Sequence, residues 1–189
     1  MAQPIIPTYQ YSEYIERLER SQIRLEFLDG TVYAMAGGTP RHDKLCARIA
    51  ALVGSHLRDG CEAYSPDQRV RAQGAGLFPD FTVVCGPEQF ASDDPHAIVN
   101  PALVVEVLSP STAATDQTTK ADRYKSLASL REFVLVWQEE VRVQVHRRTD
   151  RGGWEVEDYR AGQVVMLSIC GAKLEIDALY RGLIEASED

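Results

Sequence analysis

The sequence lacks a long hydrophobic run: no segment reaches the roughly 18 consecutive apolar residues that a membrane-spanning helix requires. Its first residues include Pro4 and Pro7 but no basic stretch followed by an apolar core, which is the pattern of a secretory signal. We therefore expect a cytoplasmic protein with no membrane partner.

Cysteine is scarce and unclustered. Cys46, Cys61, Cys85 and Cys170 form no C-x-x-C pair, and each lies among apolar neighbours in the sequence. This pattern predicts buried free thiols rather than disulfides or a zinc site. The chain also has no Gly-x-Ser-x-Gly motif, no P-loop and no dinucleotide fingerprint, so we expect no small-molecule cofactor.

Positive charge is in deficit. The net charge of -8 and the pI near 5.1 argue against binding nucleic acid through a broad basic surface. Residues 76–115 contain no Lys or Arg at all, whereas the flanking blocks 41–75 and 116–151 are mildly basic. A cation attracted by the acidic residues of the middle block must therefore be a metal ion or come from a neighbouring segment.

The first half of the chain predicts helices and strands in mixed order. Ser12 can cap a short helix, and Asp29-Gly30 is typical of the turn of a hairpin over residues 24–35. Apolar residues at helical spacing predict a helix from Pro40 to about Arg58, with Gly60 as its stop. Four extended runs follow, over residues 61–64, 68–72, 81–85 and 102–108, while Gly74 to Gly76 is interpreted as a loop.

The second half predicts a further helix and several strands. A helix starting at Ser111 or Thr115 runs through Lys120, Tyr124 and Leu127. Alternating patterns then predict strands over 132–137, 141–147, 154–158 and 164–169, and a last helix over 177–184. The order indicates one α+β (mixed α/β) domain over residues 1–189.

One carboxylate lies inside an apolar strand. Glu106 is flanked by valines and leucines, and burying an unpaired carboxylate costs several kcal/mol. Asp80 opens another apolar strand, so adjacent strands could bring the two acids together at one sheet edge. Two carboxylates a few ångströms apart repel each other unless a cation lies between them, and oxygen ligands suit Mg²⁺ or Mn²⁺.

A basic side chain could reach these acids from the following helix. Asp116, Lys120 and Tyr124 recur at a spacing of four residues, which places them on one helix face. Structural interpretations compete with the functional ones: Asp80 as a strand-start cap, Glu106 as half of an ion pair, and Lys120 with Tyr124 as a solvated face or packing residues.

Six segments together resemble the Uma2 family of restriction-endonuclease-like proteins, in the PD-(D/E)XK nuclease superfamily. They are LEFLDG (25–30), YAMAGGTPRH (33–42), PDFTVVCG (79–86), LVVEVLSPST (103–112), DQTTKADRY (116–124) and EFVLVW (132–137). The resemblance spans most of the chain, and it implies a central mixed β-sheet flanked by helices.

The resemblance also implies roles for particular residues. Asp80 and Glu106 would bind a divalent metal, Mg²⁺ or Mn²⁺, with the carbonyl of Val107 as a third ligand. The superfamily's lysine two residues after the strand acid is replaced here by Leu108, so the resemblance to Uma2 implies that its role has passed to Lys120.

Two further residues complete the predicted catalytic set. His42, at a helix start, would position a ligand or water, and Glu26 in the hairpin is a weaker candidate of the same kind. The other histidines, His56, His96 and His146, are predicted to be surface residues. The favoured function is a metal-dependent endonuclease acting on DNA as a homodimer. The alternative is a catalytically silent module that keeps the fold and binds protein or nucleic acid.

Overall fold

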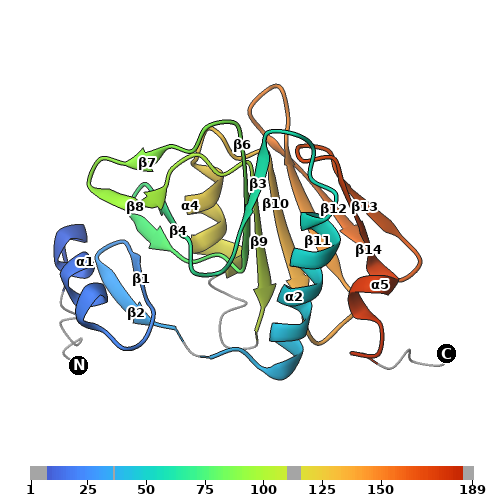
Figure 1. The fold of residues 1–189 in the computed structure, drawn as a ribbon, viewed down its shortest axis with the longest axis horizontal. Helices are drawn as coiled ribbons and strands as arrows, with labels where there is room; N and C mark the ends of the chain where they lie inside the picture. Colours follow the sequence, from blue (N-terminus) through green and yellow to red (C-terminus); the bar gives the residue numbers. More distant parts are fainter. Residues whose placement is uncertain (1–7, 36, 110–115, 185–189) are drawn as a thin grey trace, which may run out of the picture.

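The computed structural model describes residues 8–35, 37–109 and 116–184. A central six-stranded mixed sheet organises these residues (Figure 1). Its strand order is β12 (Trp154–Tyr159), β11 (Val143–Arg148), β10 (Glu132–Trp137), β9 (Leu103–Leu108), β6 (Phe81–Cys85) and β3 (Cys61–Tyr64). β9 and β10 run parallel, and the other neighbours are antiparallel. The valine-rich sequences of β6, β9 and β10 suit strands covered on both faces.

Helix α2 (Pro40–Gly54) covers one face of the central sheet, the face nearer the viewer in Figure 1. The Thr39 hydroxyl caps the helix by accepting a hydrogen bond from the His42 amide, and Pro40 occupies the first turn. Alternate residues of β9, from Leu103 to Val107, pack with the apolar face of α2 in one core. The strand β9 is therefore buried on this side by a long, well-capped helix.

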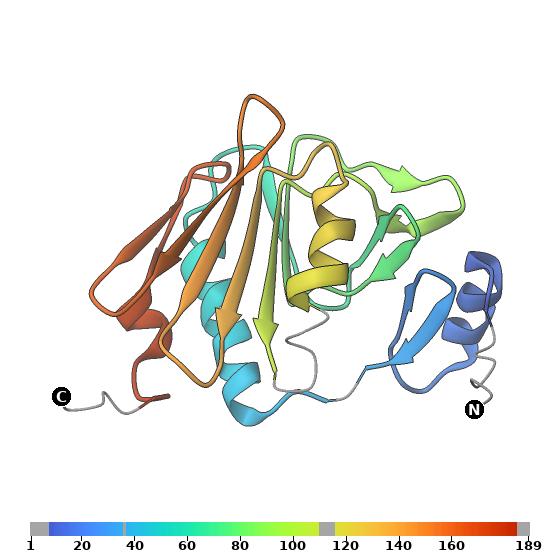
Figure 2. The same cartoon turned by 180° about the vertical axis from the view of Figure 1, so that it is seen from behind.

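A second core fills the opposite face. The π-helical turn η1 (Asp116–Lys120) leads into α4 (Ala121–Lys125), which lies between the central sheet and a second sheet (Figures 1 and 2). That second sheet has the order β2 (Thr31–Ala34), β1 (Leu25–Leu28), β5 (Ala75–Leu77), β4 (Arg69–Ala72), β8 (Asp94–Ile98) and β7 (Phe90–Ala91). Glu106 therefore sits on a face that both α4 and the second sheet cover.

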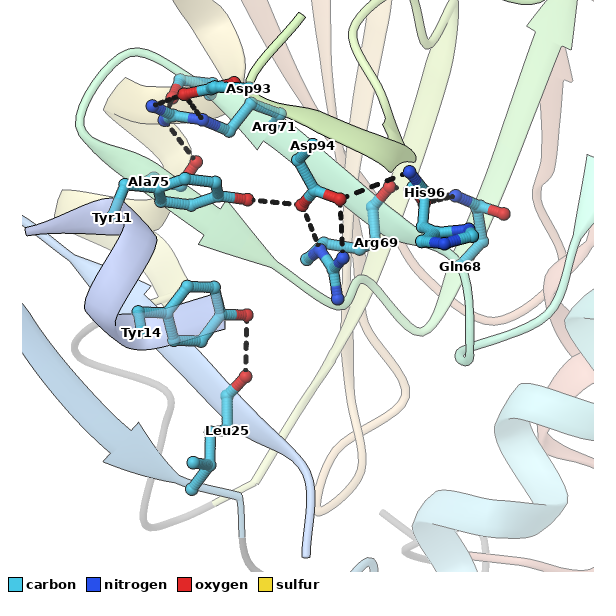
Figure 3. A network of polar contacts seen from close by, with 11 residues as sticks. Tyr11, Tyr14, Leu25, Gln68, Arg69, Arg71, Ala75, Asp93, Asp94 and His96 are labelled. Atoms are coloured by element: carbon cyan, nitrogen blue, oxygen red, sulfur yellow. Dashed lines mark hydrogen bonds and ion pairs between the residues drawn. The ribbon is translucent and has the colours of Figure 1, made fainter. Parts of the chain in front are cut away.

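Helix α1 (Tyr11–Arg20) is tied to the second sheet by the polar network of Figure 3. Arg69 of β4 forms a two-point ion pair with Asp94 of β8, at 2.5 and 2.7 Å, and the Tyr11 hydroxyl donates to the same carboxylate at 2.7 Å. The Tyr14 hydroxyl donates to the carbonyl of Leu25 at 2.9 Å. These bonds satisfy the buried Asp94 and fix α1 against strands from three parts of the chain.

The C-terminal part extends the first core. The hairpin of β13 (Val164–Leu167) and β14 (Ala172–Glu175) is followed by α5 (Ile176–Tyr180), and all three elements bury apolar residues with α2. None of the helices in the described ranges is long and apolar enough to cross a membrane.

Most predicted elements are confirmed, but several of them begin or end at residues other than those predicted. Strands 81–85 and 132–137 have the predicted bounds, and Asp29 and Gly30 both take positive φ in the hairpin turn. Helix α1 begins one residue before Ser12 and is capped by Gln10, because Gln10 and Glu13 bond to each other's backbone. Helix α2 ends at Gly54, not Arg58, and the hydroxyl of the next residue, Ser55, donates to the carbonyl of Ala51.

Short strands were missed. β5 includes the Ala75-Gly76 pair that the sequence places in a loop, and β7, β8 and β14 were not predicted. The last helix covers only Ile176–Tyr180 of the predicted 177–184. Ser111 and Thr115, the predicted helix starts, lie outside the described residues.

The prediction of free thiols is wrong for two of the four cysteines. Cys61 and Cys85 form a disulfide between β3 and β6. Their strands pair in a register that sets these two residues directly opposite each other, which spacing along the sequence does not reveal. Cys46 and Cys170 are free, as predicted.

Candidate active site

Asp80 and Glu106 are brought together by the pairing of β6 with β9. Phe81 pairs with Val105 in this antiparallel ladder, so one further step along the register sets Asp80 opposite Glu106. The amide of Val107 donates to Asp80 Oδ2 at 2.7 Å, which fixes the carboxylate beside β9. The structure therefore places the predicted acid pair on two neighbouring interior strands of the central sheet, where β6 begins.

Glu106 is buried in the middle of the sheet, with 4% of its surface exposed. The hydroxyl of Tyr124, from α4, donates to Glu106 Oε1 at 2.8 Å. Burial raises the pKa of Glu106 well above its usual range, and the neighbouring carboxylates of Asp116, Asp80 and Glu26 add to the rise against the opposing charge of a lysine. Tyr124 thus orients a carboxylate that the protein alone leaves short of positive charge.

Lys120 brings one positive charge to this group of carboxylates. Its Nζ lies 2.8 Å from Glu26 Oε2 and 3.1 Å from Asp116 Oδ1, with 7% of the residue exposed. Burial would lower the pKa of Lys120, but the charges of Glu106, Glu26 and Asp116 outweigh burial and raise it. The interpretation of Lys120 and Tyr124 as a solvated helix face is wrong, because η1 and α4 turn that face onto the buried side of the sheet.

Glu26 reaches the same group from β1 in the second sheet. Its Oε1 accepts a hydrogen bond from the backbone amide of Phe78 at 2.9 Å, and its Oε2 pairs with Lys120. Asp116 joins through the lysine and was not in the predicted catalytic set. Its four-residue spacing from Lys120 was the signal available in the sequence.

His42 contacts the acid pair from the other helix. Its Nε2 lies 3.3 Å from Asp80 Oδ2, and the bond to Asp80 raises the pKa of His42. One helical turn later, Cys46 Sγ lies 3.5 Å from His42 Nδ1, and Asp43 Oδ1 lies 3.6 Å from the same nitrogen. One ligand atom each from His42, Cys46 and Asp80 lie within 4.8 Å of one another. Sequence reasoning missed Cys46 by treating it as an inert buried thiol.

A cavity of about 280 Å³ adjoins this part of the site. Cys46 and Asp80 form one part of its wall, and Ala50, Tyr64 and Phe81 form other parts, between α2 and strands β3 and β6. Space for a ligand therefore borders the carboxylate of Asp80.

The sequence also made predictions for Val107 and for three further histidines. Val107 contacts Asp80 through its amide, while the predicted role of its carbonyl as a ligand stays a prediction. His56 and His96 are exposed, as expected. His146 is not a surface residue: it is 8% exposed, because it packs on the ring of Phe133 and contacts the ammonium of Lys125.

Comparison with known proteins identifies relatives of the whole chain. The Uma2 family model, described as "Putative restriction endonuclease", matches residues 11–178. The Synechocystis sp. protein slr1290 is 33% identical over 180 residues, covering 94% of each chain. A second Synechocystis protein, sll1609, is 27% identical over 146 residues, or 76% of this chain and 82% of its own.

A solved structure shows the same fold. The "putative nuclease belonging to DUF820" from Anabaena variabilis has a TM-score of 0.72 at 18% sequence identity, covering 94% of this chain and 98% of its own. The predicted restriction-endonuclease-like class, with a mixed sheet flanked by helices, is thereby confirmed. The family match and the likeness to slr1290 each cover most of the sequence. This chain belongs to the Uma2 family.

Proposed function

We propose that this protein is an endonuclease that hydrolyses DNA phosphodiester bonds with the help of Mg²⁺ or Mn²⁺ bound at Asp80 and Glu106. The observation that carries the proposal is the charge around Glu106. In the described part of the chain, three other carboxylates, Glu26, Asp80 and Asp116, and the ammonium of Lys120 act on this buried carboxylate. An excess of buried negative charge is what a metal-free cation site presents.

The donor chemistry at Asp80 and Glu106 fits a hard divalent cation. Both residues offer carboxylate oxygens, and the carbonyl of Val107 is the third oxygen in the proposal. When bound, such a cation lowers the pKa of a water ligand and offsets charge on the phosphate.

Residues of the chain then position the proposed metal ligands and stabilise negative charge on the phosphate. The Tyr124 hydroxyl holds Glu106 in one orientation, and the Val107 amide does the same for Asp80. The proposed role of Lys120 is to stabilise negative charge that develops on the phosphate, with Glu26 and Asp116 holding its ammonium in place. His42 positions the Asp80 carboxylate and adds positive charge beside it when protonated.

The proposal also includes the cellular location, the substrate and the oligomeric state of the protein. A single domain over residues 1–189 would carry out the reaction in the cytoplasm. The proposed substrate is duplex DNA, and a homodimer would let two copies of the site face opposite strands. The mildly basic blocks that flank the acidic middle of the sequence supply the charge for phosphate contacts.

One observation favours the alternative of a catalytically silent module. Lys120 already has two carboxylate partners, so the ion pairs could serve stability alone. In that case the fold would bind protein or nucleic acid without cleaving it. The two functions differ in whether the acid pair needs a metal.

The test compares Glu106→Gln with Glu62→Gln, a control that changes an exposed strand carboxylate. Calorimetric titration with Mg²⁺ and Mn²⁺ measures metal binding, and cleavage of DNA and RNA substrates with metal or EDTA measures activity. We expect Glu106→Gln to lose metal binding and cleavage with no loss of melting temperature, because glutamine can still accept the Tyr124 bond and brings no charge into the core. Unchanged metal binding, or a wild-type protein that binds no divalent cation, would contradict the proposal and favour the silent module.

A further inference from the structure

We propose that His42, Cys46 and Asp80 form a second metal site, one that selects Zn²⁺ over Mg²⁺. The three side chains come from two elements: His42 and Cys46 from consecutive turns of α2, and Asp80 from the residue that precedes β6. An imidazole, a thiolate and a carboxylate are the three ligand types that zinc binds in proteins.

The three side chains lie close together around the ring of His42. Asp80 Oδ2 lies 3.3 Å from His42 Nε2, and Cys46 Sγ lies 3.5 Å from the other ring nitrogen, Nδ1. Ligands at zinc bond lengths of about 2.0 to 2.3 Å in a tetrahedron are about 3.3 to 3.6 Å from one another. One donor atom from each residue lies within 4.8 Å of the others, and binding an ion on Nε2 requires Cys46 Sγ to move from Nδ1 toward Nε2.

Neighbouring residues hold two of the three ligands in place and determine which ring nitrogen of His42 binds the ion. The Thr39 cap and Pro40 fix the first turn of α2, and the Val107 amide holds Asp80. Because Asp43 Oδ1 faces His42 Nδ1 at 3.6 Å, Nδ1 can donate to a carboxylate while Nε2, nearest Asp80, binds the ion. A histidine ligand whose other nitrogen donates to a carboxylate is the usual arrangement at protein zinc sites.

The proposed zinc site lies beside an open cavity and differs in chemistry from the proposed magnesium site. The cavity of about 280 Å³ includes Cys46 and Asp80 in its wall. Magnesium prefers oxygen ligands, whereas thiolate and imidazole favour zinc and neighbouring transition metals. Three protein ligands leave one tetrahedral position for water.

A consequence follows for activity, and this part rests on the proposed function. Asp80 belongs to both sites, so zinc held by His42 and Cys46 withdraws a ligand from the magnesium pair. Zinc would then inhibit cleavage, and Cys46 would set the sensitivity to zinc.

Binding is tested with Co²⁺, which takes zinc sites and reports a thiolate ligand by an absorption band. Wild-type protein with its disulfide intact is titrated with Co²⁺ alone and then with Zn²⁺. We expect a thiolate-to-cobalt charge-transfer band that zinc abolishes. Cys46→Ser should remove the band, and His42→Ala should weaken binding by at least the ten- to hundred-fold that an outer ligand partner contributes. A wild-type protein without the band, or a Cys46→Ser variant that keeps it, overturns the proposal.

Matched controls separate the site from other cysteines and histidines. Cys170→Ala removes the other free thiol of the structure, and His56→Ala removes an exposed histidine that follows α2. Both should keep the cobalt band, and a band that disappears with Cys170 assigns the thiolate elsewhere and overturns the proposal. Melting curves establish that each variant is folded.

A cleavage assay tests the consequence for activity. Zinc is titrated into the magnesium reaction of wild-type protein and Cys46→Ser, each measured relative to its own zinc-free rate. We expect the zinc concentration for half inhibition to rise at least tenfold in Cys46→Ser. Equal inhibition refutes the shared ligand, whereas a wild-type protein that binds cobalt but never cleaves DNA refutes the nuclease proposal and leaves the zinc site supported.

Discussion

Replacing Lys120 with methionine perturbs the centre of the candidate site in a way that the structure quantifies. Methionine preserves the length of the side chain but removes the ammonium that lies 2.8 Å from Glu26 and 3.1 Å from Asp116. All three side chains are buried, so water cannot solvate the two carboxylates that lose their partner. Breaking a buried ion pair by removing one partner costs about 3 to 5 kcal/mol. We expect a loss of that size in the free energy of unfolding at pH 7.

The loss should depend on pH, with a sign that follows from the carboxylates. Lys120 opposes the rise in the pKa of Glu106, so its removal raises that pKa further. The folded state then binds more protons than the unfolded chain at pH values above the ordinary glutamate pKa, and stability falls as pH rises. The penalty of Lys120→Met should therefore be smaller at pH 5 than at pH 7.

The measurement is urea unfolding of the wild type, Lys120→Met and the double variant Lys120→Met with Glu26→Gln. With the denaturant slope unchanged, the midpoint of Lys120→Met should fall by about 1 M or more. The double variant should recover about 0.5 to 3 kcal/mol, because one uncompensated carboxylate has been neutralised while its bond from Phe78 can persist. Arginine at position 120 is the control for charge.

A small and pH-independent effect would refute this reasoning. An exposed ion pair contributes only about 0 to 1 kcal/mol, so a loss in that range would mean that water reaches Lys120. Activity of Lys120→Met must then be measured below its own unfolding midpoint, because loss of fold would mimic loss of catalysis.

Two further predictions concern other buried charges. Asp94→Asn should lower the free energy of unfolding by about 3 to 5 kcal/mol at pH 7, because Arg69 loses its buried partner, while the exposed Asp93→Asn serves as a control. Burial raises the pKa of Asp94, but bonds from Arg69 and Tyr11 outweigh burial and lower it, so the contribution of Asp94 is present at neutral pH and is lost as pH falls through its folded pKa; equal loss at all pH values would contradict this. Burial lowers the pKa of His146 from 6.5 to about 4, so the unfolded chain binds more protons between these values and stability should fall as pH drops from 6.5 to 4. His146→Gln should flatten that slope in urea unfolding, and an unchanged slope would refute the assignment.

Local chemistry was enough to predict the long strands and the hairpin, but not the short strands of the second sheet. Gly76 resembles a loop residue, yet it lies in β5, paired with β1 and β4, and a Cβ there would meet the ring of Tyr11 at 2.8 Å. β8 contains Pro95 and begins with Asp94, whose carboxylate is bonded by Arg69 from another strand and by Tyr11 from α1. These strands are stabilised by partners distant in sequence, so no local pattern announces them.

In the candidate site, too, some features follow from the local sequence and others depend on residues distant in the sequence. The sequence predicts that Asp80 and Glu106 could meet, but only the register of β6 against β9 brings them opposite each other. Glu26 was a weak candidate because nothing near it in sequence indicates its ion pair with Lys120. Cys46 was predicted to be a buried free thiol from its apolar neighbours, although its spacing from His42 is one helical turn and places the two side chains together.

The residue that departs from the superfamily pattern helps to explain how a lysine from another element reaches the site. Leu108 stands where the resemblance implies a lysine, and it is buried in the core that also contains Ala121 and Tyr124 of α4. A lysine at position 108 would put an ammonium into this apolar contact, where an unpaired charge costs several kcal/mol. Leucine instead contributes to the core that seats α4, and the seated helix continues from η1, which carries Lys120 to Glu26 and Asp116 beside Glu106. Leu108 in the strand and Lys120 on the following helical turn are therefore parts of one packing arrangement, which places the positive charge of Lys120 near Glu106.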